Sequence, residues 1–338
     1  MRQGNNGDNE CGSNSGIPMF DLSEYLDRLW QPTASPEALT DALWTYQLQT
    51  NAVMGDFARG LGRHAPFSMP IAFFKEFAMQ CGQWPAEAIF ESSGTTGQTP
   101  SRHYVRDLRL YRRNVLAGFR AVFPDQSYRI LALLPSYLER GNSSLVYMVQ
   151  TWIDAFGTVG SGFFLHDFEA LRRAIEAAQQ AGEHLLLIGV AFALLDFAEQ
   201  TGTALPADSV VIETGGMKGR RAELTRAELH ARLQAGLGIE RIHSEYGMTE
   251  LMSQAYTRGG ERFYPAPTLR AWVSDVHLDT LVMPPGQTGR LHLIDLANVH
   301  SCGFIATDDL GRLHEDGSFE VLGRIDQAEL RGCSLMYV

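Results

Sequence analysis

Two neighbouring stretches decide the fold class: LLLIGVAFALLDFAEQ (residues 185–200) and SVVIETGG (residues 209–216). The short apolar run at 185–188 predicts a buried strand, and the pattern of 191–200 predicts a helix. Residues 209–213 form a second apolar strand candidate, which runs directly into a glycine pair. A strand, a helix and another strand in succession are typical of a parallel sheet, so we predict an α/β fold.

The same alternation extends in both directions along the chain. Further strands are predicted at 128–134, 163–164 and 241–245, and further helices at 144–156, 170–181 and 221–233. Residues 20–61 carry apolar side chains at helical spacing, whereas the chain after Glu250 has short strands separated by Gly and Pro turns. We therefore expect four parts: a disordered leader at 1–18, a helical lead-in at 19–70, an α/β core at 71–255, and a β-rich subdomain with a C-terminal arm at 256–338.

Composition and charge exclude several classes of function. The chain has 338 residues, of which 45% are hydrophobic and 20% charged, as in ordinary soluble domains. Its formal net charge of −11 argues against a non-specific nucleic-acid partner, because such binding relies on Lys and Arg. The longest apolar run, 185–195, is too short to span a bilayer, so no membrane insertion is expected.

Cysteine usage and the N-terminal residues indicate the compartment. The four cysteines are far apart and form no CxxC pair, which argues against a structural zinc site and a disulfide framework. Residues 1–16 are rich in Gly, Asn and Ser and lack the apolar stretch of a signal peptide. We expect a cytoplasmic protein.

Three polar segments carry residue types that suit nucleotide chemistry. SSGTTGQTP (residues 92–100) combines glycines with hydroxyls that can donate to phosphate oxygens, although it lacks the Gly-Lys-Ser/Thr ending of a Walker A loop. YGMTE (residues 246–250) follows a predicted strand and places Thr beside a carboxylate that could bind Mg²⁺. TDDLG (residues 307–311) precedes GRID (residues 323–326), and Asp309 could accept hydrogen bonds from a ribose. Taken singly, each segment is equally or better explained as an ordinary polar loop or turn.

In this order, the segments resemble the motifs of the adenylate-forming superfamily, which contains acyl-CoA synthetases, peptide-synthetase adenylation domains and firefly-type luciferases. The resemblance runs from about residue 89 to the end. Two positions depart from the family pattern: Asp308 stands where glycine is usual, and Ser101 and Arg102 follow Pro100 where lysine is usual. The chain also stops at Val338, a few residues beyond the hinge-like 323–326 motif.

The resemblance implies the large-domain fold of these enzymes: parallel sheets packed with helices plus a small β-rich subdomain. The mobile C-terminal domain, with its catalytic lysine, is expected to be lacking. The α/β core at 71–255 would then bind the nucleotide and the acyl group. The nucleotide itself is expected in the crevice between this core and the β-rich subdomain.

The resemblance also implies a role for each matching residue, with ATP and Mg²⁺ as cofactors. Thr249 would contact the α-phosphate, Glu250 would bind Mg²⁺, and Tyr246 would lie against the adenine. Asp309 would bind the ribose hydroxyls, with Arg324 nearby. The remaining nucleotide-binding candidates are Ser93, Gly94, Thr95, Thr96 and Gly97 at the phosphates, and Gly215, Gly216 and Gly247 near the base. The implied chemistry is attack of a substrate carboxylate on the α-phosphorus with loss of pyrophosphate, helped by positioning and charge neutralisation.

The C-terminal LRGCSL (residues 330–335) is similar to the bacterial luminescence acyl-protein synthetases. Those proteins activate a fatty acid, carry it as a thioester on a cysteine near the C-terminus and pass it to a partner reductase. Cys333 is therefore a candidate acyl carrier, and an ordinary tail cysteine is the alternative. Lys218 could meet the carboxylate or phosphate, or be a solvated lysine. His243 and Phe192 could line the pocket, or simply pack in the core.

Three functions remain open at this point. The first is an acyl-protein synthetase that converts a carboxylic acid, expected to be a fatty acid, into acyl-AMP and then into a thioester on Cys333 or a partner protein. The second is a ligase of the same superfamily that loads coenzyme A or an acyl carrier protein. The third is a catalytically degenerate nucleotide-binding scaffold.

Overall fold

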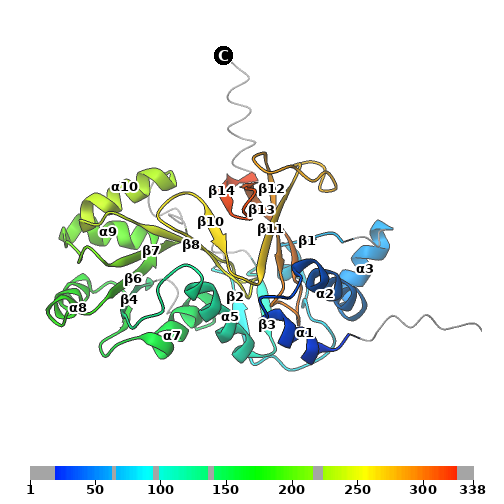
Figure 1. Ribbon diagram of the computed structural model, residues 1–338, viewed down its shortest axis with the longest axis horizontal. Coiled ribbons are helices and arrows are strands. Elements are labelled where there is room, and N and C mark those ends of the chain that lie inside the picture. Colours follow the sequence, from blue (N-terminus) through cyan, green and yellow to red (C-terminus); the bar gives the residue numbers. More distant parts are fainter. Residues whose placement is uncertain (1–19, 63–65, 94–98, 136–140, 216–223, 326–338) are drawn as a thin grey trace, which may run out of the picture.

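The computed structural model describes residues 20–62, 66–93, 99–135, 141–215 and 224–325. Twelve of the strands in these ranges form one mixed sheet (Figure 1). Its order is β11-β12-β13-β14-β10-β9-β8-β7-β6-β4-β5, with β1 paired to β13. The expected α/β fold is confirmed, and the sheet is continuous across residues 255 and 256. The expected division of the chain into four parts stays a prediction.

One half of the sheet is parallel. All six residues of its central strand β6 are buried, which explains the uninterrupted apolar run that predicted it. Helices cover both faces of this half, with α9 and α10 on one face and α5 and α7 on the other (Figure 1). The parallel strands are β4 (Arg129–Leu133), β5 (Gly162–Phe164), β6 (Leu185–Val190), β7 (Val210–Thr214) and β8 (His243–Tyr246). The helices are α5 (Leu108–Arg120), α7 (Ser144–Phe156), α8 (Phe168–Gln180), α9 (Ala191–Thr201) and α10 (Arg226–Leu237).

Capping residues fix where these helices begin. Ser143 accepts a hydrogen bond from the backbone N–H of Val146 and starts α7 at the predicted residue. The helix predicted at 221–233 lies instead at Arg226–Leu237. Thr225 and Glu228 form a capping box that sets this start, and Gly238 ends the helix in a left-handed conformation. The prediction was therefore wrong about the boundary, although it identified the element.

The other half of the sheet is antiparallel. A hairpin joins β13 to β14, and Gly317 takes φ +80° at the turn between them. The antiparallel strands are β9 (Ala255–Thr257), β10 (Phe263–Pro265), β11 (Leu269–Ser274), β12 (Thr288–Asp295), β13 (Phe304–Leu313) and β14 (Phe319–Arg324). The segment 307–311, predicted to be a turn when read alone, lies within β13.

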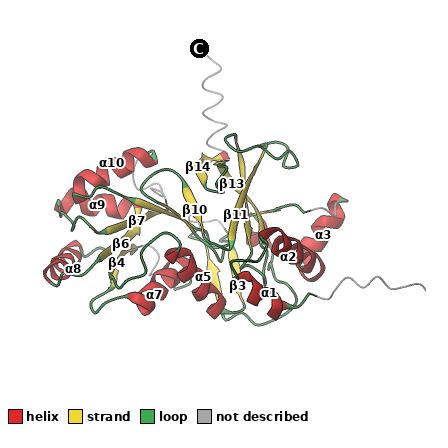
Figure 2. Ribbon diagram, viewed as in Figure 1, coloured by secondary structure: helices red, strands yellow, loops and turns green. Residues whose placement is uncertain are grey.

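The helical lead-in packs against this antiparallel half. The Tyr25 hydroxyl donates to the Leu296 carbonyl at 2.8 Å, and Gln47 Nε2 donates to the Asn298 carbonyl at 2.8 Å. Trp44 meets Phe304 edge-on with ring centroids 5.2 Å apart. Figure 2 shows these helices beside the β11–β13 side of the sheet. The elements are α1 (Leu22–Leu29), α2 (Pro36–Thr50), α3 (Ala52–Leu61), β1 (Met69–Pro70) and α4 (Phe73–Glu76).

A separate two-stranded hairpin, which the sequence pattern did not predict, flanks the glycine-rich segment. It consists of β2 (Ala88–Glu91) and β3 (Arg102–Val105), with Glu91 paired to Arg102. The two ends of the segment 92–100 are therefore held together. The Ser92 hydroxyl also accepts a hydrogen bond from the Ser101 N–H at 2.8 Å.

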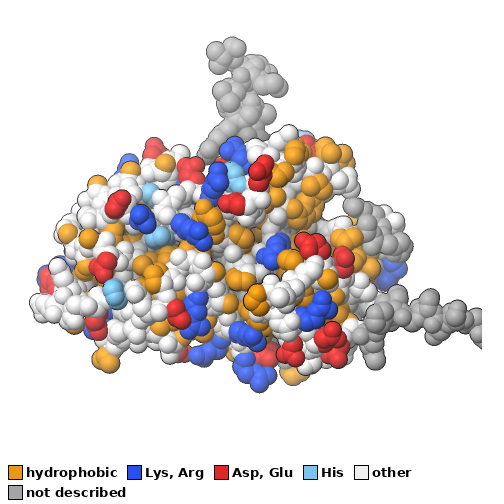
Figure 3. All heavy atoms as spheres, in the orientation of Figure 1, with side chains coloured by type: hydrophobic (Ala, Val, Ile, Leu, Met, Phe, Trp, Pro, Cys, Tyr) orange, Lys and Arg blue, Asp and Glu red, His pale blue; other side chains and the backbone are white. Residues whose placement is uncertain are grey.

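The outer surface mixes charges of both signs on the face drawn in Figure 3. Hydrophobic atoms gather at its upper right, over the loop between β11 and β12, where Leu278, Leu281 and Val282 are each more than half exposed. No helix in the described part of the chain is both long enough and apolar enough to cross a membrane.

Candidate active site

A cavity of about 1180 Å³ lies at the carboxyl ends of β7 and β8, where the parallel half meets the β13–β14 hairpin. Strand ends of this kind are the usual ligand site in open α/β sheets. The lining contains every candidate nucleotide-site residue that the structure describes. These are Ser93, Gly215, Tyr246, Gly247, Thr249, Glu250, Asp309 and Arg324.

The last two residues of β8 both line the cavity, and we call the sides of the cavity on the two faces of the sheet its α10-side lobe and its α5-side lobe. Successive side chains of a strand point to opposite faces of the sheet, so Glu245 and Tyr246 face different lobes. Tyr246 faces the α10-side lobe, which is lined by Arg226, Tyr246, Phe263, Asp309 and Arg324. Glu245 faces the α5-side lobe, which is lined by Tyr111, Ser144, Leu145, Met148 and Glu245.

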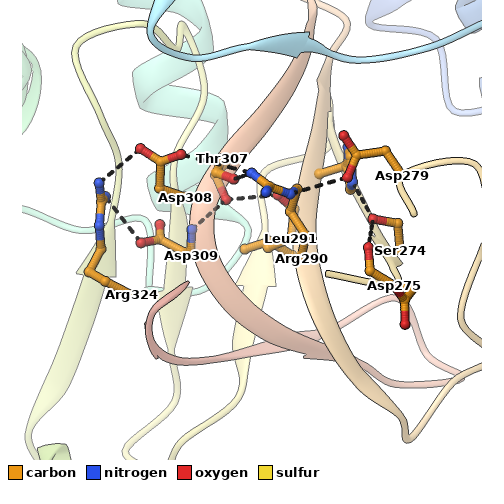
Figure 4. Close-up of polar contacts among 10 residues, drawn as sticks. Ser274, Asp275, Asp279, Arg290, Leu291, Thr307, Asp308, Asp309 and Arg324 are labelled. Atoms are coloured by element: carbon orange, nitrogen blue, oxygen red, sulfur yellow. Dashed lines mark hydrogen bonds and ion pairs between the residues drawn. The ribbon is translucent and has the colours of Figure 1, made fainter. Parts of the chain in front are cut away.

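In the α10-side lobe, Asp309 accepts hydrogen bonds from two side chains. The Tyr246 hydroxyl donates to its Oδ2 at 2.8 Å, and Arg324 Nη1 donates to its Oδ1 at 3.3 Å. Figure 4 shows the Arg324 guanidinium between Asp309 and Asp308, whose Oδ2 lies 3.1 Å from Nη2. Burial raises the pKa of Asp309, while Tyr246 and Arg324 oppose this rise. The motif residues 246, 309 and 324 thus meet at one carboxylate.

Asp308, the residue that departs from the family pattern, belongs to a network of ion pairs with arginine side chains. Its carboxylate lies between Arg324 and Arg290, with Arg290 Nη1 at 3.9 Å from its Oδ1 (Figure 4). Arg290 also pairs with Asp279 at 3.2 Å and donates to the Thr307 carbonyl at 3.1 Å. Asp308 is about half exposed, so water screens these ion pairs.

Buried side chains fix the loop that carries Thr249 and Glu250. Asn298 Nδ2 donates to the Glu250 carbonyl at 2.9 Å, and His103 Nδ1 lies 2.8 Å from the Thr249 carbonyl. Asp295 accepts from the N–H groups of Met252 and Ser253 at 2.7 and 3.0 Å. Hydrogen bonds from buried side chains that do not line the cavity therefore fix the backbone of this loop.

His103 and Asn298 also contact each other. His103 Nε2 lies 3.1 Å from Asn298 Oδ1, whose amide is oriented by Nδ2 donating to Glu250 and Cys302. Burial lowers the pKa of His103 to about 4, so its ring is neutral near pH 7 and donates from one nitrogen only. Sequence reasoning missed His103, Asn298 and Asp295. They are single polar residues outside any motif, and only the fold brings them under the loop.

Glu250 is a nearly buried carboxyl group in the lining of the cavity. It is only 5% exposed, and burial raises its pKa, while Ser101 and Lys75 act in the opposite sense. The described residues contain no cluster of three metal-ligating side chains. Mg²⁺ commonly uses one or two carboxylates together with substrate phosphates and water, so Glu250 suits this ion.

The charge of the lining also favours a cation alongside a polyphosphate. Among the described lining residues, carboxyl groups outnumber guanidinium groups. A nucleotide phosphate would be repelled by such a surface unless a cation lay between them. The carboxyl residues are Glu213, Glu228, Glu245, Glu250, Glu261, Asp309 and Glu320, and the guanidinium residues are Arg226 and Arg324.

Two glycines of the cavity wall have local reasons to lack a side chain. Gly215 directly follows β7 and has φ +68°, a conformation that other residues rarely adopt. A Cβ on Gly247 would collide with the Glu245 carboxyl oxygen Oε1. Both positions let the chain turn closely around the cavity.

Several candidate residues lie outside the described residues: Gly94, Thr95, Thr96, Gly97, Gly216, Lys218 and Cys333. Their roles stay predictions, as do the nucleotide roles of the described candidates. His243 and Phe192 do not line the cavity. His243 Nδ1 lies 2.9 Å from the Thr257 carbonyl and Phe192 is a buried core residue, so the core-packing alternative fits both.

Comparison with known proteins is consistent with this geometry. The family model described as "Acyl-protein synthetase, LuxE" matches residues 146–337. Among solved structures, 2-hydroxyisobutyryl-CoA ligase in the postadenylation state, in complex with R3-HIB-AMP, has a TM-score of 0.61 at 10% identity, covering 89% of this chain and 70% of its own. ATP-bound MatB from Rhodopseudomonas palustris has a TM-score of 0.51 at 19% identity, covering 72% of this chain.

A third solved structure has the same fold. o-Succinylbenzoate CoA synthetase (MenE) from Bacillus subtilis, bound with the product analogue OSB-NCoA, has a TM-score of 0.50 at 18% identity, covering 72% of this chain. The chain spans 49% of the MatB chain and 50% of the MenE chain, about half of each. No curated protein matches the sequence. The expected large-domain fold of adenylate-forming enzymes is therefore confirmed.

Proposed function

Because the chain belongs to the LuxE acyl-protein synthetase family, we propose that it uses ATP to activate a carboxylic acid as an acyl-adenylate. The carboxylate oxygen attacks the α-phosphorus, a new O–P bond forms, and the bond to the β-phosphate oxygen breaks to release pyrophosphate. The observation that supports this proposal most is the convergence of Tyr246 and Arg324 on Asp309, beside Thr249 and Glu250, in one cavity.

In this proposal, the α10-side lobe holds the nucleotide. Asp309 accepts hydrogen bonds from the ribose hydroxyls, and the Tyr246 ring covers one side of the base. Arg324 and Thr249 donate toward the sugar and the α-phosphate, with the phosphate chain extending toward Ser93. Pre-oriented donors of this kind stabilise charge that develops on the phosphate oxygens.

Glu250 would hold Mg²⁺, which supplies charge neutralisation at the phosphates. Its carboxylate is anchored by Asn298 through the backbone and by Ser101 through the side chain. The structural likeness to ATP-bound MatB is compatible with ATP as the nucleotide.

The α5-side lobe would receive the acyl group. Part of its wall is apolar, formed by Leu145 and Met148 from α7 and by the ring of Tyr111 from α5. An apolar wall favours an acyl chain, which agrees with a fatty acid as the substrate.

A second step would transfer the acyl group to a thiol. A thiolate attacks the acyl carbonyl, a C–S bond forms, and AMP leaves as the C–O bond breaks. We propose Cys333, followed by a partner protein such as a reductase or an acyl carrier protein, as the acceptor, in a cytoplasmic setting. Coenzyme A is the second candidate acceptor, because two of the similar structures are CoA ligases or synthetases by name.

Labelled fatty acid tests the acceptor directly. With ATP and Mg²⁺ but no CoA, the wild-type protein should retain the label after denaturation, in a form released by hydroxylamine. Cys333→Ser should lose the retained label but keep acid-dependent pyrophosphate exchange, whereas the control Cys11→Ser should keep both. If the protein retained no label in this reaction and acyl-CoA formed in a parallel reaction with added CoA, the second acceptor would be favoured.

A further inference from the structure

The α5-side lobe contains the carboxyl group of Glu245. An entirely apolar acyl chain in this lobe would offer it no hydrogen-bond partner. Glu245 is 9% exposed and lines the lobe beside Tyr111 and Met148. The Thr214 hydroxyl donates to its Oε2. No Lys or Arg side chain among the described residues forms an ion pair with it. Within those residues, the Thr214 hydroxyl alone offsets the cost of burying this carboxyl group.

Gln254 provides a second, independent sign of polarity in this lobe. It is 4% exposed, lines the cavity, and its Oε1 has no hydrogen-bond partner among the described residues. A Cβ on Gly247 would collide with Glu245 Oε1 and lie 3.4 Å from Gln254 Cγ, so both side chains lie against Gly247. Buried acceptors without donors are costly, which is why they commonly mark a ligand position.

The proposed nucleotide contacts do not use these two groups. Asp309, Tyr246 and Arg324 lie in the other lobe, because Tyr246 and Glu245 alternate across the sheet. The groups that face Glu245 are the Thr214 hydroxyl from β7, Tyr111 from α5 and Tyr256 from β9, with the Glu213 carboxylate close enough to act on it electrostatically. In the described part of the chain, these surroundings consist of hydroxyl groups and a second carboxylate, without a Lys or Arg.

We propose that the acid activated here carries a hydroxyl or an ammonium group on its chain, and that this group donates a hydrogen bond to Glu245 in the α5-side lobe. This inference rests on the proposed function, since it names the substrate class of the same site. Glu245 and Gln254 are then specificity-determining residues. The apolar wall of Leu145 and Met148 receives the rest of the chain.

Acid-dependent pyrophosphate exchange with matched pairs of acids tests this assignment. Each pair has one chain length and differs only by a hydroxyl or amino group, which is moved along the chain from the carbon next to the carboxylate outward. The wild type should favour a donor-bearing member by at least about tenfold in kcat/KM, the effect of satisfying one buried acceptor. Comparison of the hydroxyl-bearing acids with the amino-bearing acids shows which group donates the hydrogen bond.

Three variants locate the effect. Glu245→Gln keeps the side-chain shape and an acceptor for Thr214, and it should reduce the preference severalfold or more. Gln254→Leu should also reduce it, and it serves if Glu245→Gln folds poorly. Glu240→Gln is the matched control. This exposed residue precedes the other end of β8, so its substitution should leave the preference unchanged.

The outcomes separate this inference from the proposed function. Equal use of both members of every pair would overturn the inference while exchange itself upheld adenylation; no exchange with any acid would overturn the function. If Glu245→Gln lowered Tm and reduced exchange equally with all acids, the role of Glu245 would be structural, to connect β8 to β7 through Thr214. A rise in the KM for ATP alone would place Glu245 at the nucleotide. Either result contradicts the inference.

Discussion

The hydroxyl of Tyr246 donates a 2.8 Å hydrogen bond to Oδ2 of Asp309, which joins the end of the parallel half to the middle of β13. The two residues are 63 positions apart in the sequence. Tyr246 also packs on Phe263 and Phe319, with ring centroids 5.6 and 5.5 Å away. The bond therefore fixes the position of the Asp309 carboxylate relative to β8 in a packed aromatic environment.

Removal of this hydroxyl in Tyr246→Phe should weaken nucleotide binding. The Asp309 carboxylate loses a donor in a buried site, at a cost of about 1–2 kcal/mol, so the KM for ATP should rise roughly tenfold. Pyrophosphate exchange at varied ATP measures this change. Tyr25→Phe is the control, because its hydroxyl bonds the Leu296 carbonyl away from the cavity. An equal KM increase in both variants would show that the effect is one of general stability.

Asp308 and Asp309 should differ sharply in their effect, although both pair with Arg324. Asp308→Asn removes a half-exposed, screened ion pair and should change stability by less than about 1 kcal/mol. Asp309→Asn should raise the KM for ATP by at least about tenfold, because it alters a buried acceptor. Chemical denaturation and exchange kinetics measure the two quantities. A larger KM effect from Asp308 than from Asp309 would contradict the assigned ribose contact.

Asn298→Ala should slow the reaction through the backbone of the Thr249–Glu250 loop. It leaves the Glu250 and Cys302 carbonyls without their donor, at a cost of about 2–4 kcal/mol for two buried groups. Asn51→Ala is the matched control. That amide donates to the Ser301 carbonyl at 3.0 Å and its oxygen caps α3, away from the cavity.

Both asparagine variants should lower Tm, but only Asn298→Ala should lower kcat at temperatures where each protein is folded. Circular dichroism and exchange assays on the same samples compare the two. If Asn51→Ala lost kcat to the same extent, the role of Asn298 in positioning the loop would be refuted.

Glu245 should make stability depend on pH. Burial raises its pKa to about 7, so the folded state keeps a proton that the unfolded state releases near pH 4.5. The folded state binds more protons between these values, and this contribution to stability is lost as pH rises through about 7. The wild type should therefore lose, relative to Glu245→Gln, on the order of 1–3 kcal/mol of unfolding free energy between pH 4.5 and 8. Urea titrations across this range test the difference, and a constant difference would argue against the raised pKa.

The sequence predicts almost all elements of the parallel half of the fold. A strand that is buried on both faces of a sheet is apolar at every position, so the apolar run at 185–188 predicted β6. The helix α7 was predicted to its end residues. The start of α10 was missed because the Thr225–Glu228 capping box was not recognised. The β2–β3 hairpin was missed because each strand has only four residues and the burial of β2 follows no regular alternation.

The site was predictable only where residues fall into motifs. Tyr246, Asp309 and Arg324 were identified because their segments resemble family motifs, but their convergence on one carboxylate depends on β8 and the β13–β14 hairpin meeting in the fold. His103, Asn298 and Asp295 act through long-range hydrogen bonds to backbone groups. Such bonds leave no local pattern in the sequence. Glu245 was hidden because a carboxylate at a strand end is ordinarily solvated, and only the packing of α5 and α7 buries it.

Exchange of labelled pyrophosphate into ATP, measured with and without a panel of fatty, hydroxylated and aromatic acids, tests the central claim most directly. The account predicts that label enters ATP only when an acid is present and that Glu250→Gln lowers the rate by at least about a hundredfold. No exchange with any acid, in a protein shown to bind ATP, would contradict adenylation at this cavity and favour a nucleotide-binding scaffold.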